Sequence, residues 1–185
     1  MRWVHQYSLE VEKKIRRHLR PINNSWRVDE TYIKVKGEWK YFYRAVDSNG
    51  NTIDFMLSAK RNRKAAKRFF KKALSSNHNQ IPRVITVDKN PTYPPGIDKL
   101  KNDKILPRNV GIRQIKYLNY IIEQDHRSIK RIVNPMLGFQ FFQSATKILK
   151  GIEAMNMIKK GQVKNLNYSS LNEAKYINQL FGIVL

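Results

Sequence analysis

The sequence contains no cysteine, so the fold can include neither a disulfide bond nor a zinc site built on thiolates. It also lacks any run of about 18 apolar residues, the length that a membrane-spanning helix needs. The chain does not open with a charged segment followed by a short apolar one, so we predict no signal peptide. The lack of cysteine is compatible with a reducing cytoplasm.

Acidic residues are scarce: 14 Asp and Glu stand against 36 Lys and Arg, which gives a net charge of +22. The basic residues are spread along the whole chain, in stretches such as KKIRRHLR, KRNRKAAKR and HRSIKR. This charge predicts a polyanionic partner, with nucleic acid as the first candidate and a structural RNA-binding protein or a well-solvated basic surface as alternatives. An anionic membrane fits less well, because no basic segment has the pattern of an interfacial anchor.

The chain has 185 residues, of which 41% are hydrophobic, enough for one substantial core. We predict three parts: an N-terminal helix and linker at 1–25, a core at 26–162, and a C-terminal loop and helix at 163–185. Within the first part, apolar residues at helical spacing over 2–19 predict a helix, and Pro21 with the following asparagines ends it.

The core begins with three strand-like segments rich in β-branched and aromatic residues, at 26–35, 39–46 and 52–57. Gly37 and Glu38 make the first turn, and DSNG at 47–50 has the composition of a second tight turn. The short connections predict an antiparallel meander.

Helical and strand-like segments then alternate, which predicts an α/β domain with a mixed sheet. The predicted helices cover 62–76, 118–133, 141–158 and 171–180, and the predicted short strands cover 83–87 and 111–117. Residues 89–103 are predicted to form a loop or a short helix.

The helix at 118–133 has an apolar stripe, formed by Leu118, Ile122, Ile129, Ile132 and Val133. At 100° per residue, Glu123 points about 140° away from Leu118, on the same side as Arg127 and Lys130. Asp125 instead points within about 20° of Leu118, onto the apolar stripe. We therefore expect Asp125 to pair with a buried cation or a backbone amide.

Three carboxylates occupy places where this topology brings side chains together. Asp29 lies within the first strand, Asp88 follows the short strand RVITV, and Glu123 lies on the outward side of the helix. Clustered carboxylates repel one another unless a cation joins them, and hard oxygen ligands suit Mg²⁺ or Mn²⁺. Two such ions about 4 Å apart support in-line phosphoryl displacement. Composition alone leaves open whether the three acids share a site.

Four stretches resemble, in order and spacing, the bacterial transposases of the insertion-sequence-six family: WRVDETYIKVKGEWKYFYRAVDSNGNTIDF, PRVITVDKNPTYP, IKYLNYIIEQDHRSIKR and GIEAMNMIKKGQ. Together they span about 26 to 162. The resemblance implies an aspartate-aspartate-glutamate triad on a ribonuclease-H-like, mixed five-stranded core. The 34 residues between Asp88 and Glu123 resemble the family's interval between its second and third acids.

Carried onto this sequence, the family's triad falls on Asp29, Asp88 and Glu123, which would be the catalytic residues and the ligands of two Mg²⁺ or Mn²⁺ ions. The implied activity is metal-dependent cleavage and strand transfer of DNA during transposition of an insertion sequence. We expect DNA contacts from a set of basic residues: Lys89, Arg127, Lys130 and Arg131. The resemblance also implies a homo-oligomer on DNA, no membrane partner, and a cytoplasmic, nucleoid-associated bacterial protein.

The sequence departs from the family pattern in places. Tyr120 follows Asn119 where the family has two asparagines, and Asn62 stands where an aspartate is common. RWVHQY resembles only the tail of the family's DNA-recognition helix, so we expect an N-terminally truncated chain. An inactive DNA-binding remnant and a ribonuclease-H-like nuclease are the alternative functions.

Other residues compete for roles. Glu30 faces away from Asp29 by strand alternation and is predicted to form a salt bridge. His126 is expected to make a structural hydrogen bond, with local assistance to the site as the alternative. Core packing is the favoured interpretation over base stacking for the aromatic residues of the meander: Trp26, Trp39, and the cluster at 41–43.

Overall fold

The computed structural model describes residues 2–76, 78–88, 91, 93–115, 119–164 and 170–182. The chain forms two compact units, one of Pro21–Gln140 and one of Met1–Arg20 with Phe141–Leu185. The core predicted at 26–162 therefore includes parts of both units, and the predicted domain limits stay a prediction.

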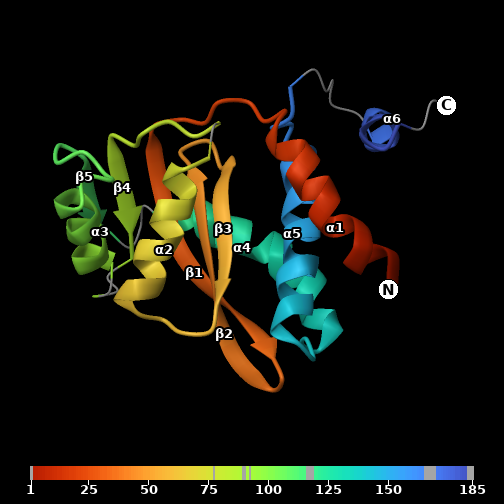
Figure 1. Cartoon of the computed structure of the whole chain (residues 1–185), viewed down its shortest axis with the longest axis horizontal. Coiled ribbons are helices and arrows are strands. Elements are labelled where there is room, and N and C mark those ends of the chain that lie inside the picture. The colour runs from red at the N-terminus through yellow and green to blue at the C-terminus, as the bar shows by residue number, and fades with distance from the viewer. Residues whose placement is uncertain are drawn as a thin grey trace. The chain divides into compact units, whose positions relative to one another are not determined.

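The larger unit contains a five-stranded sheet in the order β3-β2-β1-β4-β5 (Figure 1). The strands are β1 (Ser25–Val35), β2 (Glu38–Asp47), β3 (Thr52–Ser58), β4 (Val84–Val87) and β5 (Gly111–Gln114). The first three pair as an antiparallel meander, whereas β4 and β5 add in parallel to β1. The predicted mixed sheet is thus confirmed. The last predicted strand is shorter than expected, and its residues 116 and 117 lie outside the described part of the chain.

Local chemistry makes the two hairpins of the meander. Lys36 and Gly37 both have positive φ, 51° and 77°, as a two-residue hairpin turn with the twist of its strands requires. Glu38 is already the first residue of β2. In the second turn, the Asp47 carboxylate accepts hydrogen bonds from the backbone N–H groups of Asn49 and Asn51, both 2.9 Å long.

Helices α2 (Arg63–Leu74) and α3 (Tyr93–Asn102) cover one face of the sheet (Figure 1). Asn62 caps α2 by accepting a hydrogen bond from the backbone N–H of Ala65. The core under these helices is aromatic and aliphatic, and its largest members are Trp26, Tyr43, Phe69, Phe70 and Tyr93.

Core packing is confirmed for Trp26 and Tyr43, but it is wrong for Trp39, which is 61% exposed. The reason is the length of the β1–β2 hairpin. Trp26 and Tyr43 lie where β1 and β2 meet the two helices, whereas Trp39 lies near the hairpin turn, outside the core cluster. Tyr41, between them, is partly buried against the margin of that core.

Helix α4 (Tyr120–Val133) packs against β1 and β2 and continues into a short 3₁₀ helix, η2 (Asn134–Met136). Its buried residues are Ile122, His126, Ile129 and Val133, which confirms most of the predicted stripe. Ile132 is 42% exposed, so its place on the stripe is wrong; His126, one turn before Ile129, is buried on that face instead. Leu118 lies outside the described residues.

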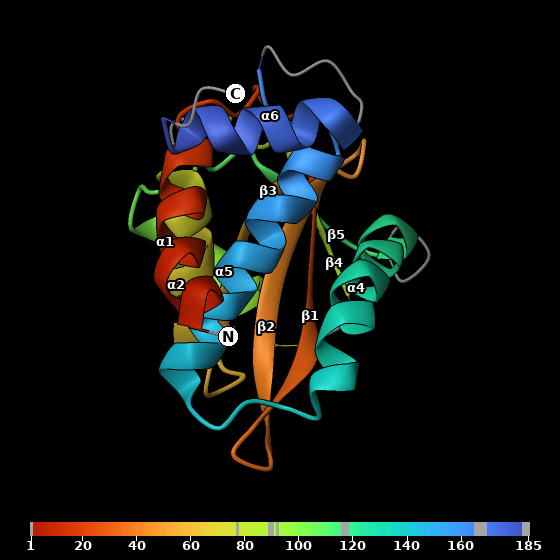
Figure 2. The ribbon, with the colours of Figure 1, turned by 90° about the vertical axis from the view of Figure 1, so that its right-hand side faces the viewer.

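The smaller unit consists of α1 (Arg2–Arg16), α5 (Phe142–Lys159) and α6 (Ser170–Leu180), at the predicted helical segments (Figure 2). α1 packs along α5, and Gly151 makes this approach possible, since a Cβ there would lie 2.3 Å from Ser8 Oγ. Backbone hydrogen bonds from Arg20 to Gln162 and from Lys164 to His18 tie the segments after the two helices together. No described helix is both long and apolar enough to cross a membrane.

Candidate active site

Two of the three predicted acids are brought together by strand pairing. In the parallel pair β1–β4, Val28 lies opposite Val87, so Asp29 and Asp88 are the next residues on two neighbouring strands. Neighbouring strands are about 4.8 Å apart. Asp88 also stands at the carboxyl end of β4, where open α/β sheets place their ligands.

A buried ion pair attaches α4 to the same face of the sheet. Arg44 lies opposite Asp29 in the β1–β2 register, and its Nη2 atom is 2.6 Å from Oδ2 of Asp125 on α4. Arg44 is fully buried and the Asp125 side chain is 9% exposed. The predicted pairing of Asp125 with a buried cation is thus confirmed. Glu123 lies in the first turn of α4, two residues before Asp125, and is exposed.

The Asp29 carboxyl is strongly perturbed. Its pKa is raised from 3.8 to about 7, chiefly by burial, then by the negative charge of Glu30 and more weakly by those of Asp88 and Glu123, against one backbone hydrogen bond at Glu30 that lowers it. Both other members of the predicted triad are thus close enough to act on Asp29 electrostatically. Such mutual repulsion is what a bound cation would relieve.

His126 separates Asp29 from the Arg44–Asp125 pair. Its Nδ1 atom is 3.7 Å from Asp29 Oδ2, which is too long for the structural hydrogen bond expected of this residue. The pKa of His126 is lowered to about 3, chiefly by burial and then by the positive charge of Arg44. The imidazole is therefore neutral near pH 7, and it fills space beside Asp29 without adding charge.

Glu30 faces the opposite side of β1 and belongs to a separate network. It accepts a hydrogen bond from the Tyr93 hydroxyl and forms a salt bridge with Arg61, which confirms the predicted salt bridge. Arg61 Nη2 is also 3.7 Å from Asp88 Oδ2. Arg61 therefore links the buried Glu30 to one of the acids at the sheet edge.

The donor set at this edge fits a hard divalent cation, since it consists of carboxylate oxygens on two rigid strands and one helix. Within the described part of the chain, no three acidic or histidine side chains lie close enough together to hold a metal ion as they stand. Asp88 is directed toward Arg61, and Glu123 projects from the exposed side of α4. Binding a cation through all three would require side-chain movement.

Comparison with known proteins agrees with this geometry. A family model described as a DDE domain matches residues 23–162. The chain is 34% identical over 166 residues to the transposase for insertion sequence-like element IS431mec of Staphylococcus aureus, covering 89% of this chain and 71% of that protein. The chain belongs to the insertion-sequence-six family of DDE transposases. The transposase for insertion sequence element IS257 in transposon Tn4003, also from Staphylococcus aureus, is related to the same extent.

Solved structures confirm the ribonuclease-H-like fold of this transposase. The catalytic core domain of the HTLV-2 integrase, in complex with magnesium, has a TM-score of 0.57 and 18% identity, covering 80% of this chain and 99% of that one. The catalytic core domain of BIV integrase has a TM-score of 0.54 and 11% identity, with coverages of 86% and 97%. At these identities the likeness concerns the fold.

Three of the four basic residues predicted to contact DNA lie on one helix. Arg127, Lys130 and Arg131 are all exposed on α4, whereas Lys89 lies outside the described residues. Sequence analysis missed Arg44 and Arg61 as partners of the acids. For Arg44 a signal was available: it is a lone charge within the apolar run YFYRAV, and such a charge needs a buried partner.

Removing the carboxylate partner of Arg44 should make the folded transposase less stable. We expect Asp125→Ala to lower the free energy of unfolding by about 3–5 kcal/mol, because a fully buried guanidinium loses its counter-charge. The matched control is Glu38→Ala. Glu38 forms an ion pair with Lys40, and its own side chain is 73% exposed. There the loss should stay below about 1 kcal/mol. Urea denaturation measures both, and equal losses would contradict the structural role of the buried pair.

The raised pKa of Asp29 should make the metal-free protein less stable as pH rises. Folding favours the protonated form of Asp29. The stabilisation that this gives is complete below pH 3.8 and is lost as the pH rises through about 7. At about 1.4 kcal/mol per pKa unit, the loss is roughly 4 kcal/mol at most. The Asp29→Asn variant cannot ionise there, so its stability relative to the wild type should increase between pH 4.5 and 7.5 in urea denaturation with EDTA.

The control is Asp103→Asn, at an exposed carboxylate whose pKa is lowered by its hydrogen bond to Lys67. Its difference from the wild type should stay constant over the same pH range, because Asp103 is ionised throughout it in both states. A constant difference for Asp29→Asn as well would contradict the raised pKa.

Proposed function

We propose that Asp29, Asp88 and Glu123 are the catalytic residues of this transposase and together hold Mg²⁺ or Mn²⁺, as two ions. The observation that carries the proposal is the buried Asp29 carboxyl, whose pKa is raised chiefly by burial and in smaller part by the charges of Asp88 and Glu123. The β1–β4 register supports it, because it makes Asp29 and Asp88 neighbours on parallel strands. A solved integrase core of the same fold is in complex with magnesium, which agrees with this assignment.

In the proposed site, each acid has a distinct role. Asp29 and Asp88 are the rigid ligands, because strands hold their backbones, and Glu123 closes the site from α4. Asp29 would bind a cation in its ionised form, since the positive charge would offset the burial and the repulsion that raise its pKa. The bound ions supply activation of the attacking oxygen and stabilisation of the leaving one.

The exposed basic residues of α4 would hold the DNA backbone. Arg127, Lys130 and Arg131 follow Glu123 on the same helix, so phosphates bound to them lie beside the acids. Lys89, directly after Asp88 in the sequence, would add a contact from the sheet edge. The net charge of +22 supports such a role and favours association with the nucleoid.

We also propose that the transposase acts as a homo-oligomer on DNA. Relatives by fold include the HTLV-2 integrase core in dimeric and trimeric forms and a simian T-cell lymphotropic virus intasome. Transposition joins two element ends to one target, and an assembly of several copies provides a site for each end.

Removing any one of the three carboxylates should abolish DNA cleavage without abolishing DNA binding. We expect Asp29→Asn, Asp88→Asn and Glu123→Gln to lower metal-dependent nicking of duplex DNA by at least about a hundredfold, as for other lost electrostatic contributions to a transition state. Affinity for DNA should be unchanged or slightly higher, because a negative charge near the phosphates is lost. Gel assays of nicking and joining, with Mg²⁺ or Mn²⁺, measure the first, and fluorescence anisotropy measures the second.

The control variant is Asp103→Asn, at an exposed carboxylate that pairs with Lys67 and is not a member of the triad, and it should nick DNA like the wild type. Equal loss of binding and cleavage in Asp29→Asn would make Asp29 structural. A wild-type protein that binds DNA but neither cuts nor joins it would be a binding remnant. Preferential cleavage of an RNA–DNA hybrid would indicate a ribonuclease instead.

Lys130→Ala should weaken binding to any DNA sequence and reduce the slope of log K against log salt by about 1, as for one lost phosphate contact. Lys99 provides the matched control, because it is an exposed lysine on α3, which covers the other face of the sheet. Lys99→Ala should leave the slope unchanged. A slope that Lys130→Ala does not alter would remove Lys130 from the interface.

A further inference from the structure

The hairpin between β1 and β2 exposes aromatic side chains that the hydrophobic effect would normally bury. Trp39 is 61% exposed and Tyr32 is 45% exposed. The two residues are close in the β1–β2 pairing. Tyr32 lies opposite Tyr41, and Trp39 lies opposite Lys34, two residues further along β1. The rings of Tyr32 and Tyr41 are 5.6 Å apart. Exposed apolar clusters of this kind mark contact surfaces.

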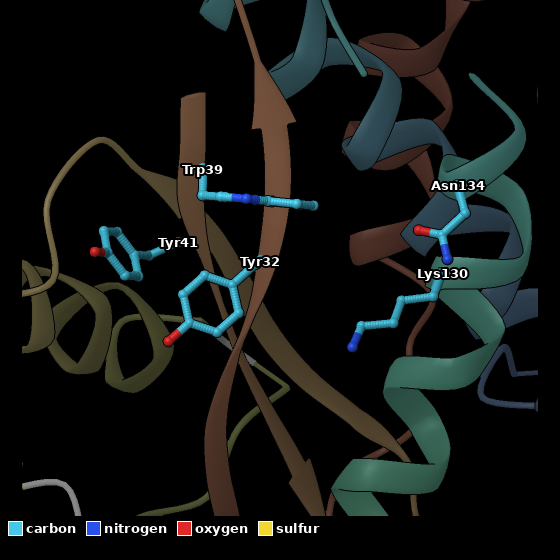
Figure 3. A pocket seen from close by; sticks show the side chains of 5 residues that line it. All are labelled: Tyr32, Trp39, Tyr41, Lys130 and Asn134. Atoms are coloured by element: carbon cyan, nitrogen blue, oxygen red, sulfur yellow. The ribbon is translucent and has the colours of Figure 1, made fainter. Parts of the chain in front are cut away.

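These aromatic residues form one wall of an open pocket, and α4 forms the other. The pocket has a volume of about 610 Å³ and is lined by Tyr32, Trp39, Tyr41, Lys130 and Asn134, which we call the aromatic groove (Figure 3). Figure 3 shows the Trp39 indole reaching across β1 toward α4, and the Lys130 side chain extending from α4 toward the strands. The volume is in the range of sites that bind small organic groups.

The charge around the groove selects for an anionic occupant. Lys130 contributes a cation from α4, and Lys34 and Lys36 lie exposed on the hairpin. Glu38, the acid beside the hairpin turn, already forms an ion pair with Lys40. Flat apolar rings beside a lysine match a nucleotide, which combines a flat base with a phosphate.

The groove lies near the predicted acids through its α4 wall. On α4, Lys130 follows Glu123 by seven residues, which is about 10 Å along the axis and about 20° around it. On β1, Tyr32 lies three residues, again about 10 Å, beyond Asp29, and its side chain leaves the opposite face of the strand. This distance corresponds to about three stacked bases of one DNA strand.

We propose that the aromatic groove binds an unpaired base of the DNA strand that runs through the active site, a few nucleotides from the bond that is cut. Trp39 and Tyr32 stack on the base, Lys130 contacts an adjoining phosphate, and the Asn134 amide hydrogen-bonds the edge of the base. The base must be unpaired, because in a duplex both of its faces are covered by neighbouring bases. The inference rests on the proposed function for the position of the strand.

The test compares single-stranded and duplex DNA of the same length and sequence, with the full-length protein in EDTA so that nothing is cleaved. We expect Trp39→Ala to weaken binding of a labelled single strand by about 5- to 150-fold in fluorescence anisotropy, the loss of one stacked base. Affinity for the duplex should change less than twofold. Trp39→Phe should retain most of the single-strand affinity, because phenylalanine still offers a stacking face.

Phe141→Ala is the matched control, since Phe141 is 62% exposed and does not line the groove. It should leave both affinities unchanged. Quenching of tryptophan fluorescence by the single strand should be smaller in Trp39→Phe than in the wild type, because Trp26 is fully buried. Thermal melts of every variant establish that it is folded.

Three outcomes would overturn the proposal. In the first, Trp39→Ala leaves single-strand binding unchanged or weakens duplex binding equally. In the second, ultracentrifugation shows that Trp39→Ala dissociates an oligomer while DNA binding stays intact, so the groove holds a second copy of the chain. In the third, RNA of the same sequence binds at least tenfold more tightly than the DNA strand, and Trp39→Ala removes this tighter binding.

The nicking assay keeps this proposal separate from the catalytic one. Trp39-dependent binding of single strands, in a protein that never cuts DNA, would support the groove and refute the triad. If cleavage depends on Asp29 but single-strand binding does not depend on Trp39, the triad is supported and the groove is refuted.

Discussion

The ion pair between Arg44 and Asp125 holds the functional part of this transposase together. Arg44 is fully buried in the sheet, so its charge requires the carboxylate that α4 provides at 2.6 Å. Because the contact fixes how α4 lies on β1 and β2, it also fixes the neighbours of Asp125 in the sequence. His126 is thereby placed beside Asp29, and Glu123 and Lys130 project from the exposed side of the helix.

Two adjacent acids on β1 show how strand alternation separates structural from chemical roles. Glu30 points toward α3, where the Tyr93 hydroxyl and Arg61 satisfy its charge. Asp29 points toward α4, and its pKa is raised to about 7 by burial first, then by the charge of Glu30 and more weakly by those of Asp88 and Glu123. A buried acid surrounded by like charges costs folding free energy, and such a cost is typical of a site prepared for a cation.

Helix α4 connects the predicted acids to the aromatic groove, because Glu123 and Lys130 are both exposed on it, seven residues apart. Phosphodiester chemistry requires both a place to hold the reacting phosphate and a means of keeping the strand in line with the attacking oxygen. In the proposed site, the acids would meet the first requirement, and the basic residues of α4 with Trp39 and Tyr32 would meet the second. Arg61 connects the acids to the core, because it joins Glu30 to Asp88.

Much of this protein was determined by local sequence. Alternating and helical spacing predicted β1 to β4, α2, α4 and α5 to within a few residues, because these periods depend only on backbone geometry. The same alternation predicted that Asp29 and Glu30 face opposite sides and that Glu30 forms a salt bridge, and helical spacing predicted the buried partner of Asp125. Resemblance to a transposase family predicted the three acids and the fold.

Tertiary structure alone decided which residues those acids meet and which aromatic residues stay exposed. The pairing of β1 with β4 joins residues almost 60 positions apart, and no local pattern specifies it. Trp39 has the same residue type and strand setting as Trp26, yet one is 61% exposed and the other fully buried. The difference arises because α2 and α3 cover only part of the β1–β2 hairpin, and burial depends on what packs against a residue from elsewhere in the chain.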